Sequence, residues 1–178
     1  MSIDALRDLL PAYAKDLSLN LSTLAGETTL SDQQKWGTFL ASAYAVGQGD
    51  VVRQIRSAAE AFGLSEEAAE AARAAAAIMA MNNVYYRSLH LLTNREYRTL
   101  PARLRMNVIG NPGVDKADFE LWCLAVSAIN GCGMCLDSHE AELKKHGVEA
   151  ARIQTALRIA ATVNAVSRVI AAERAIES

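Results

Sequence analysis

Two cysteines separated by two residues, Cys132 and Cys135, are the side chains in this sequence best suited to chemistry. If the first of them stands at the start of a helix, both thiols lie on one face within disulfide reach, near the positive end of the helix dipole. Such a position can lower a thiol pKa and favour the nucleophilic thiolate. The whole chain has three cysteines, too few for a secreted disulfide scaffold, so the pair indicates redox or metal chemistry.

His139 and Glu120 can serve this pair. His139 follows Cys135 by four residues and Cys132 by seven, so the spacing predicts that all three project from one helical face. There an imidazole can take or return a thiol proton. Glu120 precedes Cys132 by 12 residues. If the chain folds back near residue 130, the carboxylate can orient the imidazole or exchange a proton with a thiol.

Zinc binding is the main alternative for the cysteine pair. Structural zinc sites usually add a second such pair or two closely spaced histidines, which Cys123, His90 and His146 do not supply. Cys123 is expected to be a small buried hydrophobe, His146 to lie at a helix C-terminus, and His90 to be an exposed helix residue. These interpretations favour redox chemistry and predict no bound metal. A purely structural role, in which the cysteine pair only cross-links two helices, remains an alternative.

The elements that must position these groups are predicted to be helices throughout. The chain has 33 alanines and only three prolines, and nowhere do β-branched and polar residues alternate over the length of a strand. Its 178 residues suit a single all-α domain, 1–178, with an N-terminal half of about 1–92, a connection of about 93–115 and a catalytic half of about 116–178. A faint likeness between residues 80–83 and 128–131 raises the possibility of two related helical halves. Without strand–helix–strand units, the cysteine pair cannot belong to a thioredoxin fold.

Capping residues and glycines predict the bounds of the helices. Ser31 and Gln34 have the form of a capping box, and the helix that they begin should end at Gly47. The alanine-rich segment near residues 66–86 is expected to be central to the core or to a subunit contact. Further helix starts are predicted at Asp50, Ser65, Asp115 and about Cys132, with one or two helices over 149–177.

Composition and charge exclude some functions. The net charge of −2 supplies no positive field for nucleic acid. The longest apolar run is eight residues, 74–81, too short to cross a bilayer, and the acidic N-terminus does not look like a secretory signal. A cytoplasmic protein with neither a membrane nor a nucleic-acid partner is expected.

The pattern Glu120-x11-Cys132-Gly-Met-Cys135-x3-His139 resembles the alkyl hydroperoxidase D (AhpD) proteins of the carboxymuconolactone decarboxylase superfamily, and the likeness includes residues 11–16, 36–40, 81–87 and 111–113. The resemblance implies an all-helical subunit, usually a homotrimer, that reduces alkyl hydroperoxides with no tightly bound cofactor. Its redox-active disulfide would be re-reduced by dihydrolipoamide on a lipoylated acyltransferase, which lipoamide dehydrogenase recharges with NADH. Such proteins can also reduce the peroxiredoxin AhpC.

The resemblance also implies a role for each site residue. Cys135 would attack the peroxide and become a sulfenic acid, and Cys132 would donate a proton and resolve the sulfenic acid to the disulfide. His139, as the base, and Glu120 would relay protons. Met134 departs from the pattern, because well-studied members have a histidine there. The helix dipole and expected exposure favour Cys132 as the stronger nucleophile, whereas the family assigns attack to a deeper Cys135; His139, one turn from Cys135, can reconcile the two. Cys132 would then receive the incoming dithiol or attack the AhpC disulfide.

Three other functions stay open at this point. The protein could be a redox adaptor for AhpC with little peroxidase activity of its own. It could be a metal-binding or structural helical protein. A decarboxylase on the same scaffold is the least favoured, because the cysteine pair suits redox chemistry better.

Overall fold

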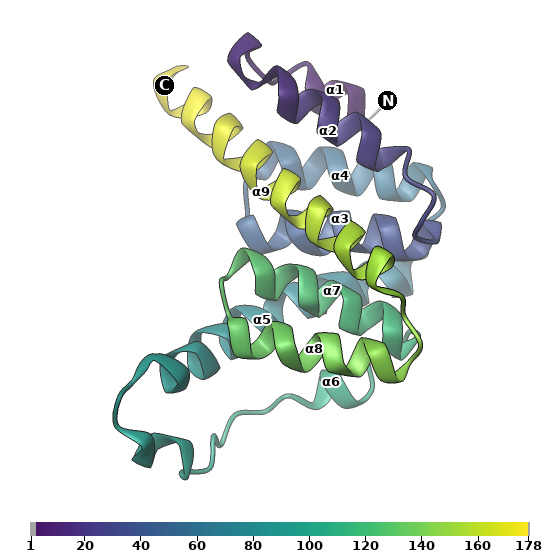
Figure 1. The fold of residues 1–178 in the computed structure, drawn as a ribbon. Helices are drawn as coiled ribbons and strands as arrows, with labels where there is room; N and C mark the ends of the chain where they lie inside the picture. Colours follow the sequence, from purple (N-terminus) through teal and green to yellow (C-terminus); the bar gives the residue numbers. More distant parts are fainter. Residues whose placement is uncertain (1–2, 178) are drawn as a thin grey trace.

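The computed structural model describes residues 3–177, and these form an all-α fold without β-strands (Figure 1). The expected fold class is therefore confirmed. Short 3-10 turns cover Ala12–Ala14 and Arg95–Arg98. The helices are α1 (Ile3–Arg7), α2 (Lys15–Ala25), α3 (Asp32–Val46), α4 (Gly49–Ala61), α5 (Glu66–Leu91), α6 (Asn107–Gly110), α7 (Lys116–Ile129), α8 (Gly133–Lys145) and α9 (Ala150–Glu177).

Helix α7 is the centre of the molecule. It packs against α3, α5, α8 and α9, and every side chain from Asp118 to Ser127 is buried. In Figure 1 the long helix α9 crosses over α3, with α2 and α4 above and α5, α7 and α8 below. A helix that is apolar on nearly all sides is stable only inside a core. Glu120 lies in this buried stretch, so the fold carries a carboxylate into the interior.

Most of the predicted helix ends are confirmed. Ser31 and Gln34 form the capping box, and Gly47 ends α3 with φ of 77°. The hydroxyl of Ser65 caps α5. The prediction for Asp50 is wrong: Gln48 caps α4 instead, accepting a hydrogen bond from the backbone N–H of Val51 at 2.8 Å. The longer amide side chain reaches the free N–H group, while Asp50 pairs with arginines, among them Arg53 at 2.6 Å.

The alanine-rich part of α5 lies in the core, which confirms one of the two alternatives predicted for this segment. Its alanines at 68, 69, 71, 72, 75 and 76 are all buried, and such small side chains let neighbouring helices approach closely. Beyond α5, the connection to α6 swings away from the helical body (Figure 1). The 3-10 turn Arg95–Arg98 and the short helix α6 both lie in the segment that the sequence had predicted only as a connection.

The turn between α7 and α8 brings the cysteine pair back against the core. Gly131 has φ of 68°, a conformation that favours glycine. The N–H of Cys132 donates to the carbonyl of Ser127, and that of Gly131 to Ala128, which together form a Schellman motif. From α5, Asn83 accepts a hydrogen bond from the side chain of Asn130 at 2.9 Å. The two segments with the faint sequence likeness therefore touch at this turn, while their relation as two halves stays a prediction.

A close contact between α3 and α7 predicts a large effect of one methyl group. A Cβ atom added at Gly37 would lie 2.2 Å from the buried ring of Trp122. We therefore expect Gly37→Ala to lower the free energy of unfolding by about 1 to 3 kcal/mol or more, measured by chemical denaturation. Gly110→Ala is the matched control, because a Cβ there meets nothing within 4 Å. Equal stability of the two variants would contradict the prediction.

Candidate active site

Cys132 and Cys135 are joined by a disulfide at the start of α8, with their Cα atoms 5.2 Å apart. Cys132 is the N-cap residue, and Cys135 lies in the first turn. The predicted helix start and disulfide reach are therefore confirmed. In the reduced state both sulfurs would lie near the positive end of the helix dipole, which favours thiolates.

The exposure of the two cysteines is the reverse of the expected order. Cys132 is 0% exposed and Cys135 is 7% exposed. Cys135 lines a pocket, whereas Cys132 is not among its lining residues. The physical reason is the Schellman turn, which folds the backbone of Cys132 under the end of α7. The prediction that Cys132 is the more exposed cysteine was therefore wrong, and burial now favours Cys135 as the sulfur that a small molecule reaches.

The pocket beside Cys135 has a volume of about 590 Å³ and is lined by residues of α5, α6, α7 and α8. It is large enough for a small organic molecule. His139 and Glu120 also line it, so both share the pocket with Cys135. Three methionines, at 79, 106 and 134, make part of its wall apolar.

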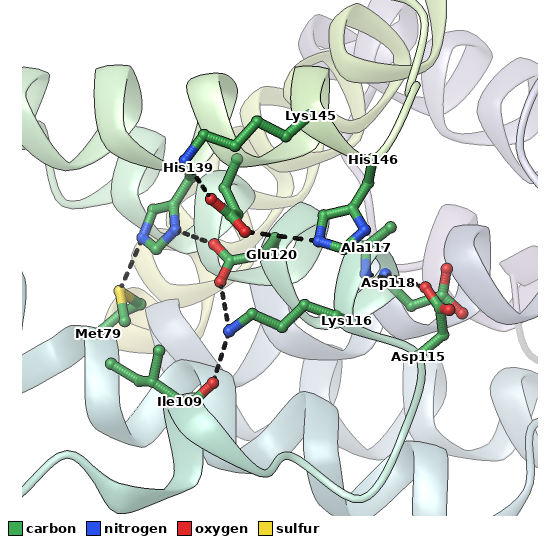
Figure 2. Close-up of polar contacts among 11 residues, drawn as sticks. Met79, Ile109, Asp115, Lys116, Ala117, Asp118, Glu120, His139, Lys145 and His146 are labelled. Atoms are coloured by element: carbon green, nitrogen blue, oxygen red, sulfur yellow. Dashed lines mark hydrogen bonds and ion pairs between the residues drawn. The ribbon is translucent and has the colours of Figure 1, made fainter.

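Glu120 and His139 form a buried pair, although 19 residues separate them in the chain. Figure 2 shows the carboxylate between the imidazole and Lys116, with Nδ1 of His139 2.6 Å from Oε2 of Glu120 and Nζ of Lys116 2.9 Å from Oε1. Burial alone would raise the pKa of Glu120, but the hydrogen bonds from His139 and Lys116 outweigh it, and the pKa is lowered. The carboxylate is therefore ionised at neutral pH and accepts the Nδ1 proton of the imidazole.

With Nδ1 occupied by Glu120, Nε2 is the imidazole nitrogen left to exchange protons. It lies 3.3 Å from Sδ of Met79, on the far side of the ring from Glu120 (Figure 2). When Nε2 carries a proton, its neighbour in the protein is this thioether, which is a weak hydrogen-bond acceptor. The contact therefore does little to hinder transfer of that proton. The arrangement can accept a proton at Nε2 and pass it to a group in the pocket.

Two members of this arrangement were missed in the sequence. Lys116 stands one helical turn before Glu120, an i, i+4 spacing that could have revealed it. It also donates to the carbonyl of Ile109 at 2.6 Å, which ties α6 to the site. Met79 comes from α5, 60 residues before His139, and no local spacing could have shown that contact.

The other cysteine and histidines lie outside the site, as expected. Cys123 is a free, fully buried thiol whose pKa is raised by burial and by the nearby charge of Glu120. His146 is the C-cap of α8, and His90 is exposed near the end of α5. Met134, at the position of the family histidine, is 39% exposed and lines the pocket.

The described residues also bear on metal binding and on membrane insertion. Within residues 3–177, no three His, Cys, Asp or Glu side chains are grouped so that they could hold a metal ion. In the described helices, none combines the length and apolar character that a bilayer crossing requires.

The part of the chain that carries the site is similar to a known protein family. Residues 95–178, which carry the cysteine pair, Glu120 and His139, match the carboxymuconolactone decarboxylase family. Three curated relatives named "Alkyl hydroperoxide reductase AhpD" match almost the whole chain. The protein from Maricaulis maris is 67% identical over 173 residues, which cover 97% of this chain and 99% of the relative.

The other two relatives are similar over the same extent. The protein from Hyphomonas neptunium is 65% identical, with 99% of this chain and 97% of the relative covered. The protein from Streptomyces coelicolor is 59% identical, with 97% of each covered. The chain therefore belongs to the AhpD family of the carboxymuconolactone decarboxylase superfamily.

Proposed function

We propose that this protein is an alkyl hydroperoxide reductase that works through a thiol–disulfide cycle of Cys132 and Cys135. The names of its relatives support the reductase activity. The observation that carries the cycle is the shared pocket, which Cys135 lines together with the buried pair of Glu120 and His139. A sulfur nucleophile, a base and a group that orients the base are the three parts that covalent catalysis needs.

In the proposed first step, Nε2 of His139 takes the thiol proton of Cys135. The thiolate attacks the outer oxygen of the hydroperoxide R–O–O–H, the O–O bond breaks, and its electron pair leaves with the alkoxide RO⁻. His139 returns its proton to the alkoxide, so the products are an alcohol and the sulfenic acid of Cys135. The negative charge of Glu120 stabilises the transient imidazolium.

In the second step, the thiol of Cys132 gives up its proton while its sulfur attacks the sulfur of Cys135. Water leaves and the disulfide forms. A dihydrolipoyl dithiol on a lipoylated acyltransferase then reduces the disulfide by exchange and becomes a cyclic disulfide itself, which lipoamide dehydrogenase recharges. The sum is ROOH plus dithiol to ROH, water and oxidised lipoyl. Because Cys135 is the accessible sulfur, the incoming dithiol is expected to attack Cys135 first, in place of Cys132 as the sequence had suggested. No other cofactor is required.

We also propose that the reduced cysteine pair can recharge a partner, the peroxiredoxin AhpC. On the basis of the family resemblance, the protein would work as a homotrimer in the cytoplasm. If the protein only relays electrons to AhpC, the same two cysteines cycle but hydroperoxide is reduced on the partner.

Steady-state turnover separates the two functions. Purified protein is mixed with an organic hydroperoxide and dihydrolipoamide, with no peroxiredoxin, and peroxide consumption is followed. We expect catalytic turnover that stops when dihydrolipoamide is omitted. If peroxide is consumed only after AhpC is added, the protein is an adaptor, and direct peroxidase activity is ruled out.

A further inference from the structure

Asn82 is a buried side chain of the pocket that the proposed cycle does not use. It lies on α5, is 4% exposed, and lines the same pocket as Cys135 and His139. Its Oδ1 atom has no hydrogen-bond partner among residues 3–177. Leaving a buried polar atom unpaired costs free energy, so a partner that enters from outside is the simplest explanation.

The neighbouring Asn83 shows what a structural asparagine looks like in this helix. It is fully buried, and both ends of its amide are satisfied, by Ser127 at 2.9 Å and by Asn130 at 2.9 Å. Four buried side-chain atoms lack a partner within the part of the chain that the structure describes. Of these, only Oδ1 of Asn82 belongs to a residue that lines the pocket. Among the buried side-chain atoms of the described residues, Asn82 therefore carries the unmet hydrogen-bonding capacity of the pocket wall.

We infer that Asn82 is a substrate-binding residue that holds the hydroperoxide group against Cys135, an inference that rests on the proposed function. A carboxamide offers one acceptor and two donor hydrogens. A hydroperoxide offers a matching O–H donor and an acceptor at the alkoxy oxygen. The O–H of the substrate donates to Oδ1 of Asn82, and an N–H of Nδ2 donates to the alkoxy oxygen.

This pairing also favours cleavage of the O–O bond. With both oxygens fixed by Asn82, the outer oxygen is available to the sulfur of Cys135, which lines the same pocket. As the O–O bond breaks, negative charge grows on the alkoxy oxygen, and the Nδ2 hydrogen bond strengthens with it. His139 then delivers its proton to that oxygen, and no further reactant is needed.

Asn82→Leu tests the inference because leucine has a similar size and neither hydrogen-bonding group. We expect the second-order rate constant for oxidation of the reduced protein by an organic hydroperoxide to fall by about 10²-fold. The rate with a neutral aromatic disulfide, 2,2′-dithiodipyridine, should not change, because that reaction reports the thiolate of Cys135 alone. The Tm should not fall, since an unpaired polar atom has been removed. Asn82→Ala gives the same test without added bulk.

Asn83→Leu is the matched control on the same helix. It removes an amide with two hydrogen bonds and should lower the Tm. A wild-type rate with hydroperoxide in both Asn82 variants would overturn the inference and leave the proposed function standing. An equal loss with hydroperoxide and with the disulfide reagent would overturn it as well, because Asn82 would then act on the thiol. A wild-type protein that does not react with hydroperoxide would overturn the proposed function, and this inference with it.

Discussion

The Cys135→Ser protein should reduce alkyl hydroperoxide at least on the order of 10³-fold more slowly than the wild type, because the sulfur that attacks the peroxide is gone. Cys132→Ser should keep the attack and lose the second step. With no dithiol present, it is expected to consume one equivalent of hydroperoxide per subunit and to stop with a sulfenic acid on Cys135 instead of a disulfide. The structural reason is access, since Cys135 lines the pocket and Cys132 is fully buried.

Peroxide consumption and a sulfenic-acid trapping reagent, read out by mass spectrometry, measure both effects. Cys123→Ser is the control, because the free thiol of Cys123 is fully buried and its raised pKa keeps it protonated. Its turnover should equal that of the wild type. Label on Cys132 in the Cys135→Ser protein, with none on Cys135 in Cys132→Ser, would reverse the roles of the two sulfurs.

The second large effect is expected from Glu120→Gln, which keeps the shape of the side chain and removes its charge. At neutral pH the oxidation of Cys135 by hydroperoxide should slow by about 10² to 10⁴-fold, because the imidazolium of His139 loses the carboxylate that stabilises it. Stopped-flow oxidation across pH measures the effect. As the pH falls and Glu120 of the wild type is protonated, the two rates should converge. Glu140→Gln, an exposed change on α8, is the control.

Stability gives an independent test of the same pair. The pKa of Glu120 is lowered in the folded protein, so the ionised carboxylate stabilises the fold. This contribution is complete above the ordinary glutamate pKa of about 4.3 and is lost as the pH falls through the lowered value of the folded state. Glu120→Gln should therefore lower the free energy of unfolding by about 1 to 3 kcal/mol at neutral pH, and the deficit should shrink in acid. A deficit that does not change with pH would show that the charge of Glu120 does not matter.

Local signals in the sequence were enough for much of the fold. Three helices are capped as predicted, by Ser31, Ser65 and Asp115. The oxygen of each of these short side chains accepts a hydrogen bond from a free N–H group of the first turn. The same rule misplaced the cap at Asp50, because it gives no weight to a glutamine two residues earlier, whose longer side chain accepts from the N–H of Val51. The short helix α6 was missed because four residues carry too little periodicity to be recognised.

The sequence by itself determined which groups are the candidates for the proposed chemistry. The three-residue step between Cys132 and Cys135 and the four-residue step to His139 are local distances along one helix, which helical geometry converts directly into space. The contact between Glu120 and His139 could be foreseen because a single turn at residues 130–131 connects their two helices.

Only the tertiary structure decided which sulfur is accessible and what surrounds it. Cys132 is buried by the way the Gly131 turn docks beneath α7, and Met79 and Asn82 reach the site from α5, far away in the chain. Burial and contacts between distant helices depend on how whole helices pack, a property of many side chains together that no local spacing contains. The pocket that joins Cys135 to Asn82 therefore exists only once α5, α7 and α8 have come together.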